Sequence, residues 1–133
     1  MSRITNAYAA GLVDGEGSVM LSRQKKGAMR SPEVTVTSTT LELLDFLRAR
    51  YGGNIIEKKV YSNRHSRAWC WRLDYRKAID FLGKVLPFMR EKSKVARAKL
   101  LVGDYVRLTP RNGKYSLDAR QAKEEFEGRF FRA

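Results

Sequence analysis

Two hairpin patterns, each followed by a helical pattern, constrain the fold of this chain most. The hairpins are predicted over residues 17–37 and 55–73, where apolar and polar side chains alternate on either side of a polar turn. Apolar residues with helical spacing lie before, between and after them. The resulting order, α-β-β-α-β-β-α-α, predicts an α+β fold. Its four-stranded antiparallel sheet should have helices on one face and a polar second face.

The ends of these elements are predicted from local signals. Three side chains are expected to cap helices: Thr5, Thr39 in a capping box with Glu42, and Asp118 before a short terminal helix. Strands are expected at 17–24, 32–37, 55–61 and 68–73, and a late helix at 93–106. In the second hairpin, Trp69, Trp71 and Leu73 are expected to face the core and Arg72 the opposite side. The alternative is that the tryptophans stack on nucleic-acid bases.

The composition indicates a single basic domain. The chain has 133 residues, 43% of them hydrophobic, and its 27 Lys and Arg against 14 Asp and Glu give a net charge of +13. Such a balance is typical of proteins that bind nucleic acid. Cys70 and His65 are single in the sequence, which excludes an intrachain disulfide, a thiolate zinc site and a His-based triad. No apolar run approaches the length of a membrane span and no signal peptide is visible, so an intracellular protein is expected, in a bacterial cytoplasm or an organelle.

Residues 9–17, AAGLVDGEG, end a predicted helix in two carboxylates separated by glycines. Asp14 is expected to turn back onto the N–H groups of its own turn, and Glu16 to lie in the strand that follows. Glu16 is the better ligand for a hard divalent cation, with a backbone carbonyl of the turn, that of Gly15, beside it. An isolated D-G-E-G is more often a solvated turn. The helix before it favours the metal site, because its small residues leave one face able to pack closely against another helix.

Residues 9–17 resemble the nine-residue signature of the LAGLIDADG homing endonucleases and related maturases, with Ala9, Val13, Gly15 and Glu16 as conservative replacements. The resemblance implies an αββαββα fold in which signature helices pair at the centre of the molecule. It also implies that Glu16 binds the catalytic metal, Mg²⁺, for which Mn²⁺ should substitute. Since the chain carries one copy of the signature, a homodimer is expected. Residues 1–133 should form one endonuclease domain, with 110–133 as a loop and a helical extension.

The resemblance and the residue pattern together predict two interaction surfaces. Residues that would meet the partner chain lie on the signature helix: Ala7, Tyr8, Ala10, Gly11 and Asp14. Residues that would contact DNA lie on the polar face of the sheet or crown the first hairpin: Ser22, Gln24, Lys25, Lys26, Arg30, Glu33, Thr35, Thr37 and Arg72. A twisted two-stranded ribbon of this kind fits the major groove, where polar side chains read base edges while Lys and Arg hold phosphates.

A second local likeness follows Pro87 and Phe88, where related endonucleases carry a basic run. Lys92 aligns with the lysine thought to polarise the reacting water or phosphate there. A solvated helix start or a phosphate clamp formed by Arg90, Lys92 and Lys94 is the alternative. Relatives often end the second strand with a glutamine that positions water, whereas this chain has Ser38.

The function implied is a site-specific homing endonuclease that makes a Mg²⁺-dependent, staggered double-strand cut in a long, roughly palindromic DNA site. Its catalytic residues would be Glu16 and Lys92, and its partners double-stranded DNA and a second copy of the chain. Two alternatives stay open from the sequence. One is a maturase that binds intron RNA, and the other is a DNA-binding regulator without cleavage.

Overall fold

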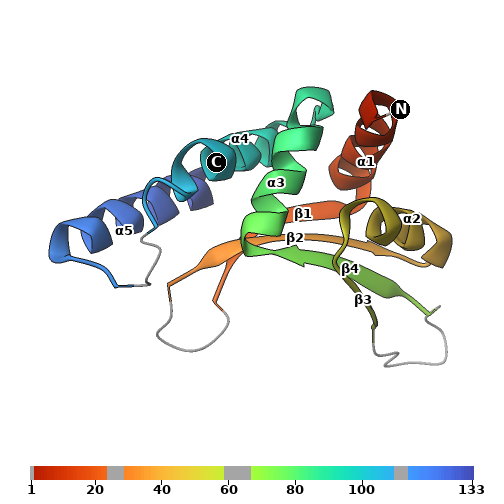
Figure 1. Cartoon of the computed structure of the whole chain (residues 1–133), viewed down its shortest axis with the longest axis horizontal. Coiled ribbons are helices and arrows are strands. Elements are labelled where there is room, and N and C mark those ends of the chain that lie inside the picture. Colours follow the sequence, from red (N-terminus) through yellow and green to blue (C-terminus); the bar gives the residue numbers. More distant parts are fainter. Residues whose placement is uncertain (1, 24–28, 59–66, 110–113) are drawn as a thin grey trace.

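A computed structural model describes residues 2–23, 29–58, 67–109 and 114–133 (Figure 1). The elements follow in the order α1 (Ser2–Glu16), β1 (Gly17–Ser22), β2 (Ser31–Ser38), α2 (Leu41–Tyr51), β3 (Asn54–Glu57), β4 (Trp69–Asp74), α3 (Tyr75–Val85), α4 (Lys92–Leu100) and α5 (Leu117–Arg132). The predicted α+β fold is confirmed.

The four strands form one antiparallel sheet in the order β1-β2-β4-β3. Helices α1, α2 and α3 lie on one side of it, and the strands curve away from them toward both hairpins (Figure 1). Every second side chain of a strand points toward the helices, and these side chains fill the space between the sheet and the helices. The strand residues buried there are Val19, Leu21, Val34, Val36, Trp71 and Leu73. The predicted core side of the second hairpin is therefore confirmed.

Helix α1 is longer than the sequence predicts. It begins at Ser2 and ends at Glu16, so Thr5 lies within the helix and does not cap it. Gly15 is also helical, and the break comes at Gly17. A Cβ atom at Gly17 would lie 2.8 Å from the Cα atom of Val13 and 2.9 Å from its carbonyl oxygen. Only glycine, which has no Cβ atom, allows the backbone at the start of β1 to lie this close to the last turn of α1.

Other element ends also differ from the sequence prediction. Strand β2 runs on to Ser38, so α2 begins after Thr40 and the Thr39 capping box does not form. Helix α5 is capped by Ser116, whose Oγ accepts a hydrogen bond from the Ala119 N–H, and not by Asp118. Strand β3 ends at Glu57, and its predicted end at Tyr61 lies outside the described residues.

The helix predicted over 93–106 is divided in two. Helix α4 ends at Leu100 and continues as a π-helical turn, Leu101–Tyr105. Helix α5 packs beyond it, at the end of the molecule that carries the first hairpin (Figure 1). Phe126 and Phe130 of α5 are fully buried and extend the core to the C-terminal part of the chain.

Lys123 of α5 is a fully buried charge. Its Nζ donates hydrogen bonds to Thr109 Oγ1 at 2.6 Å and to the Tyr115 hydroxyl at 3.2 Å, and lies 3.9 Å from the centre of the Tyr105 ring. Burial lowers the pKa of Lys123 from 10.5 to about 8, although Glu127 opposes the shift. The protonated lysine is thus less favourable in the folded chain than in the unfolded one.

We expect Lys123→Met to stabilise the protein at pH 7 and to lose this advantage as the pH rises. Between pH 8 and 10.5 the unfolded wild type binds one more proton at this lysine than the folded protein does, so this group increases wild-type stability as pH rises. The difference in free energy of unfolding between variant and wild type should fall by roughly 2 to 3 kcal/mol from pH 7 to pH 10. Denaturant titrations at both pH values measure it, with the exposed Lys99→Met as control. A pH-independent difference would contradict the assignment.

Candidate functional site: the end of α1 and the open face of the sheet

Glu16 is the last residue of α1, and its side chain is exposed. The sequence placed it in the following strand, which is wrong because the helix continues through Gly15. The chain therefore presents the Gly15 carbonyl and the Glu16 carboxylate at a helix end. The first strand of the sheet begins with the next residue, Gly17.

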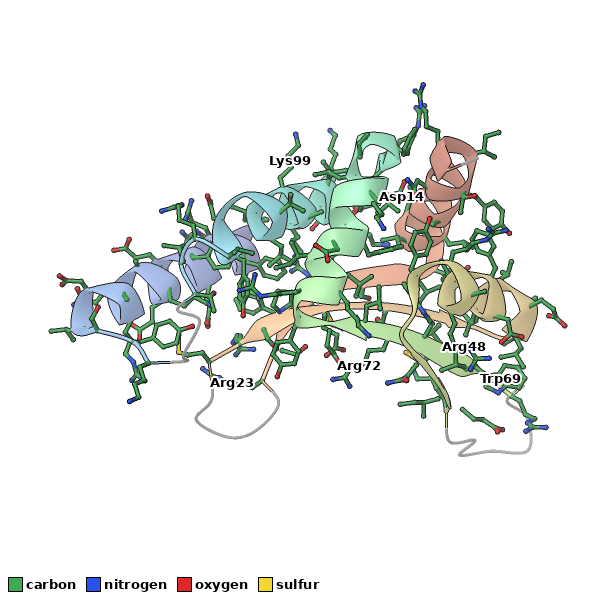
Figure 2. All side chains as sticks on the ribbon, in the orientation of Figure 1. Asp14, Arg23, Arg48, Trp69, Arg72 and Lys99 are labelled. Atoms are coloured by element: carbon green, nitrogen blue, oxygen red, sulfur yellow. The ribbon has the colours of Figure 1, made fainter. Side chains whose placement is uncertain are left out.

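Asp14 does not turn back onto its own turn. Its carboxylate accepts hydrogen bonds from the backbone N–H groups of Arg90 at 2.9 Å and Glu91 at 3.2 Å, just before α4. Figure 2 shows Asp14 on the side of α1 that faces α3. Asp14 therefore ties the end of the signature helix to the start of α4 within one chain.

The two predicted catalytic residues belong to segments that the structure brings together. Lys92 is the first residue of α4 and is exposed, one position after the N–H group of Glu91 that Asp14 binds. Lys94, which the sequence offered only as part of a phosphate clamp or a solvated helix start, lies deeper between the segments. Lys94 donates from Nζ to the carbonyl oxygens of Asp14 at 2.7 Å and Val13 at 3.1 Å.

One face of α1 is exposed and carries both large and small residues. Ile4 is 79% and Tyr8 50% exposed, and Ala7 and Gly11 also face outward. A Cβ atom added at Gly11 would have no neighbour within 4 Å. The prediction that Ala10 belongs to this face was wrong. Ala10 is fully buried because, with Ala9 and Val13, it faces the core of its own chain.

The face of the sheet away from the helices carries most of the described residues that the sequence assigned to DNA. Directly paired residues share a face, and the pairs are Ser22 with Ser31, Met20 with Glu33, Thr35 with Arg72 and Thr37 with Cys70. Arg72 projects below the sheet in Figure 2, on the side opposite the helices. Gln24, Lys25 and Lys26 lie outside the described residues.

Arg72 lies between two carboxylates on this face. Its Nε donates to Asp74 Oδ1 at 2.9 Å and its Nη2 lies 3.6 Å from Glu33 Oε2. The hydrogen bond to Asp74, with the nearby Glu33 charge, raises the pKa of Arg72 although burial opposes the shift. Glu33 is only 9% exposed and lies beside Arg72, and its contact with DNA stays a prediction.

Arg30 is bound within the chain. Its Nε lies 3.5 Å from Glu127 Oε1, and its guanidinium carbon lies 4.9 Å from the centre of the Phe131 ring. These contacts attach α5 to the first hairpin, and the phosphate contact of Arg30 stays a prediction. Ser38 is likewise occupied, since its Oγ accepts from the Thr40 N–H at 3.0 Å before α2.

The exposed end of α1 fits a magnesium ion. Magnesium is usually held by one or two carboxylates together with waters and substrate phosphates. Across the described ranges no three His, Cys, Asp or Glu side chains gather as a complete metal site. The Asp14 carboxylate already accepts hydrogen bonds from N–H groups just before α4. Glu16 is therefore the exposed carboxylate of residues 9–17. Within the same ranges no helix is long and apolar enough to cross a membrane.

Solved homing endonucleases match this chain in structure. I-CvuI, in complex with its target, gives a TM-score of 0.75 at 16% identity over 98% of this chain and 82% of that protein. The archaeal intron-encoded I-Vdi141I, complexed with DNA, gives 0.64 at 19% identity over 99% and 85%. I-SmaMI, a LAGLIDADG homing endonuclease bound to cleaved DNA, gives 0.55 at 19% identity over 90% of this chain and 48% of its own. No protein-family model and no curated protein matches the chain.

These matches cover nearly all of the chain, from the signature helix through α5. They agree with the order of helices and strands and with the single four-stranded sheet that the sequence predicts. The chain therefore has the fold of the LAGLIDADG homing endonucleases.

Proposed function

We propose that this chain is a Mg²⁺-dependent, homodimeric DNA endonuclease that makes a staggered cut in a long, roughly palindromic site. The observation that carries the proposal is the exposed Glu16 carboxylate at the end of a helix whose exposed face includes the small residues Ala7 and Gly11. A metal-binding carboxylate beside a surface suited to close helix contact fits an active site completed by a second copy.

A homodimer would pair α1 with α1 of the partner along Ile4, Ala7, Tyr8 and Gly11. Small residues let helix backbones approach closely, which strengthens packing between the helices. The two-fold axis would then bring the Glu16 carboxylates of both chains near each other, one for each DNA strand. The two sheets would extend on either side and bind two inverted half-sites.

The chemistry requires few protein groups. A metal ion held by Glu16 and the Gly15 carbonyl would lower the pKa of bound water and stabilise the leaving oxygen. Lys92, exposed at the start of α4 beside this end of α1, would contribute positive charge to the reacting phosphate. The net charge of +13 would favour binding to the DNA backbone.

The matched structures support DNA as the substrate, since I-CvuI was solved with its target and I-Vdi141I with DNA. A plasmid nicking assay with and without Mg²⁺ tests the proposal. We expect metal-dependent nicks and double-strand breaks at defined sites. Binding to DNA without any cleavage would favour the non-cleaving regulator.

The open face of the sheet is expected to set sequence preference. Arg72→Ala and Thr35→Ala should change which bases are preferred at particular half-site positions. Each lost contact should reduce the free energy of discrimination between bases by roughly 1–3 kcal/mol, with mirrored changes in both halves. Lys25→Ala and Lys26→Ala should instead weaken binding to all DNA sequences alike. The slope of the logarithm of the binding constant against the logarithm of the salt concentration should fall in magnitude by about 0.9 for each lost phosphate contact.

Site-selection profiles of the four variants measure both effects. Lys99→Ala is the matched control, because Lys99 projects from the opposite side of the molecule (Figure 2). If the Arg72 and Thr35 profiles match the wild type at every position, another surface reads the DNA.

A further inference from the structure

We infer that Lys94 is a positioning residue that holds the metal-binding end of α1 in place through a closed ring of hydrogen bonds with Asp14 and Glu91. The basic run after Pro87 otherwise suggests a phosphate clamp for this lysine. The inference rests on the proposed endonuclease function for its catalytic consequence. Its structural part concerns contacts within one chain.

The ring joins two segments that are distant in sequence. The Asp14 carboxylate accepts from the Arg90 and Glu91 N–H groups at 2.9 and 3.2 Å. The Glu91 carboxylate accepts from the Lys94 N–H at 2.7 Å as the cap of α4. Lys94 Nζ then returns to α1 and donates to the carbonyls of Asp14 and Val13 at 2.7 and 3.1 Å. The end of α1 and the segment that begins α4 therefore bind each other in both directions.

The carbonyls that Lys94 binds are informative. The last four carbonyls of a helix lack partners within it, and α1 ends at Glu16, so these four belong to residues 13–16. Lys94 binds the first two, Val13 and Asp14. The next two belong to Gly15 and Glu16, the proposed metal-binding pair. A cation at this place also interacts favourably with the negative end of the helix dipole.

The ring also fixes the start of α4. Asp14 and Glu91 bind N–H groups in and just before its first turn, and Lys92 lies in that turn. Glu16 stands two residues after Asp14, and Lys92 one residue after Glu91. Both proposed catalytic side chains thus project from a single hydrogen-bonded frame. Displacements of about 1 Å at such a frame can cost large factors in rate.

The position of Lys94 argues against a phosphate clamp. Its side chain is partly buried, and two of the three hydrogens on its ammonium group are already directed at carbonyl oxygens of α1. A lysine that holds DNA would have to give up these contacts. Lys92 and Lys99 on the same helix are exposed and offer matched comparisons.

The direct test is amide hydrogen exchange of the wild type, Lys94→Met, Asp14→Asn and Lys99→Met. We expect the Gly15 and Glu16 amides to exchange about tenfold faster in Lys94→Met and Asp14→Asn than in the wild type. Loss of the charged hydrogen bonds should let the last turn of α1 open more often. Lys99→Met should match the wild type. Unchanged exchange in Lys94→Met would overturn the inference, and this readout requires neither DNA nor metal.

The catalytic consequence is tested in parallel by single-turnover cleavage and by DNA binding in Ca²⁺. Lys94→Met should slow cleavage at saturating Mg²⁺ by about tenfold or more, while DNA affinity and its salt slope stay as in the wild type. Combining it with Asp14→Asn should add little, since both break one ring. A phosphate clamp predicts lower affinity and a slope reduced by about 0.9, which would contradict the inference.

Lys94→Arg provides a second variant if Lys94→Met does not fold. Arginine keeps the charge that a phosphate requires but replaces a compact ammonium with a planar guanidinium. We expect slower cleavage with unchanged affinity, and wild-type cleavage would overturn the positioning role. If the wild type itself does not cleave DNA, the proposed function fails, while hydrogen exchange still decides whether Lys94 holds α1.

Discussion

Glu16→Gln is expected to abolish Mg²⁺-dependent cleavage while DNA affinity stays unchanged. The amide keeps the size of the side chain and its hydrogen bonding but removes the anionic ligand from the exposed end of α1. Loss of metal-assisted water activation is worth several kcal/mol, so the single-turnover rate should fall by roughly a thousandfold or more. The measurement is single-turnover cleavage at saturating protein, beside binding of the same DNA in Ca²⁺.

Glu125→Gln is a suitable control, because Glu125 is exposed on α5 and takes no part in the proposed site. It should cleave at the wild-type rate. Undiminished Mg²⁺-dependent cleavage by Glu16→Gln would show that the metal lies elsewhere in the protein.

Gly11→Leu is expected to abolish dimerisation and cleavage together. The monomer itself should tolerate the change, because a Cβ atom at Gly11 meets nothing within 4 Å and leucine favours a helix more than glycine does. In the proposed dimer, however, the leucine side chain would separate the two α1 helices. Sedimentation of the free protein and of its DNA complex measures the oligomeric state.

Gly83→Leu provides the matched control on α3, since a Cβ atom at Gly83 also has open space around it. This variant should remain dimeric and active. A wild-type protein that sediments as a monomer on its DNA, or a Gly11→Leu variant that cleaves normally, would contradict the proposed interface.

Patterns between near neighbours predicted the fold well. Alternation in the first hairpin placed Val19, Leu21, Val34 and Val36 inside, and the same reasoning placed Trp71 correctly. These predictions succeed because the face of a strand residue follows from the pleat alone. Helix ends were predicted less well. Thr39 has the residue type of a cap, but the pairing of β2 with β4 extends the strand to Ser38, directly before it, and α2 begins only after Thr40.

Contacts between segments that are distant in the chain could not be predicted from the sequence. Asp14 has an ordinary turn context, yet its carboxylate binds N–H groups 76 and 77 residues later in the chain. Arg30 has the context of a phosphate ligand, but α5 supplies Glu127 and Phe131 beside it. A side chain with several possible partners takes the one that packing brings closest, and local spacing carries no information on that choice.

Buried charge was missed for a related reason. Lys123 lies among Arg, Gln and Glu residues in the sequence of the terminal helix. The aromatic residues Tyr105 and Tyr115, from outside α5, surround its ammonium group. Lys123 lies three residues before Phe126 and seven before Phe130, so it shares the buried face of α5, and residue type alone did not indicate this burial.

Selection of cleaved sites from a random DNA library in Mg²⁺ tests the dimeric endonuclease most directly. Two copies joined through α1 should enrich sequences with two inverted half-sites, cut on both strands with a constant stagger about the centre. The same selection with Glu16→Gln should enrich nothing. Cleavage products without two-fold symmetry, or equal enrichment by Glu16→Gln, would contradict an active site formed by two Glu16 carboxylates at a dimer axis.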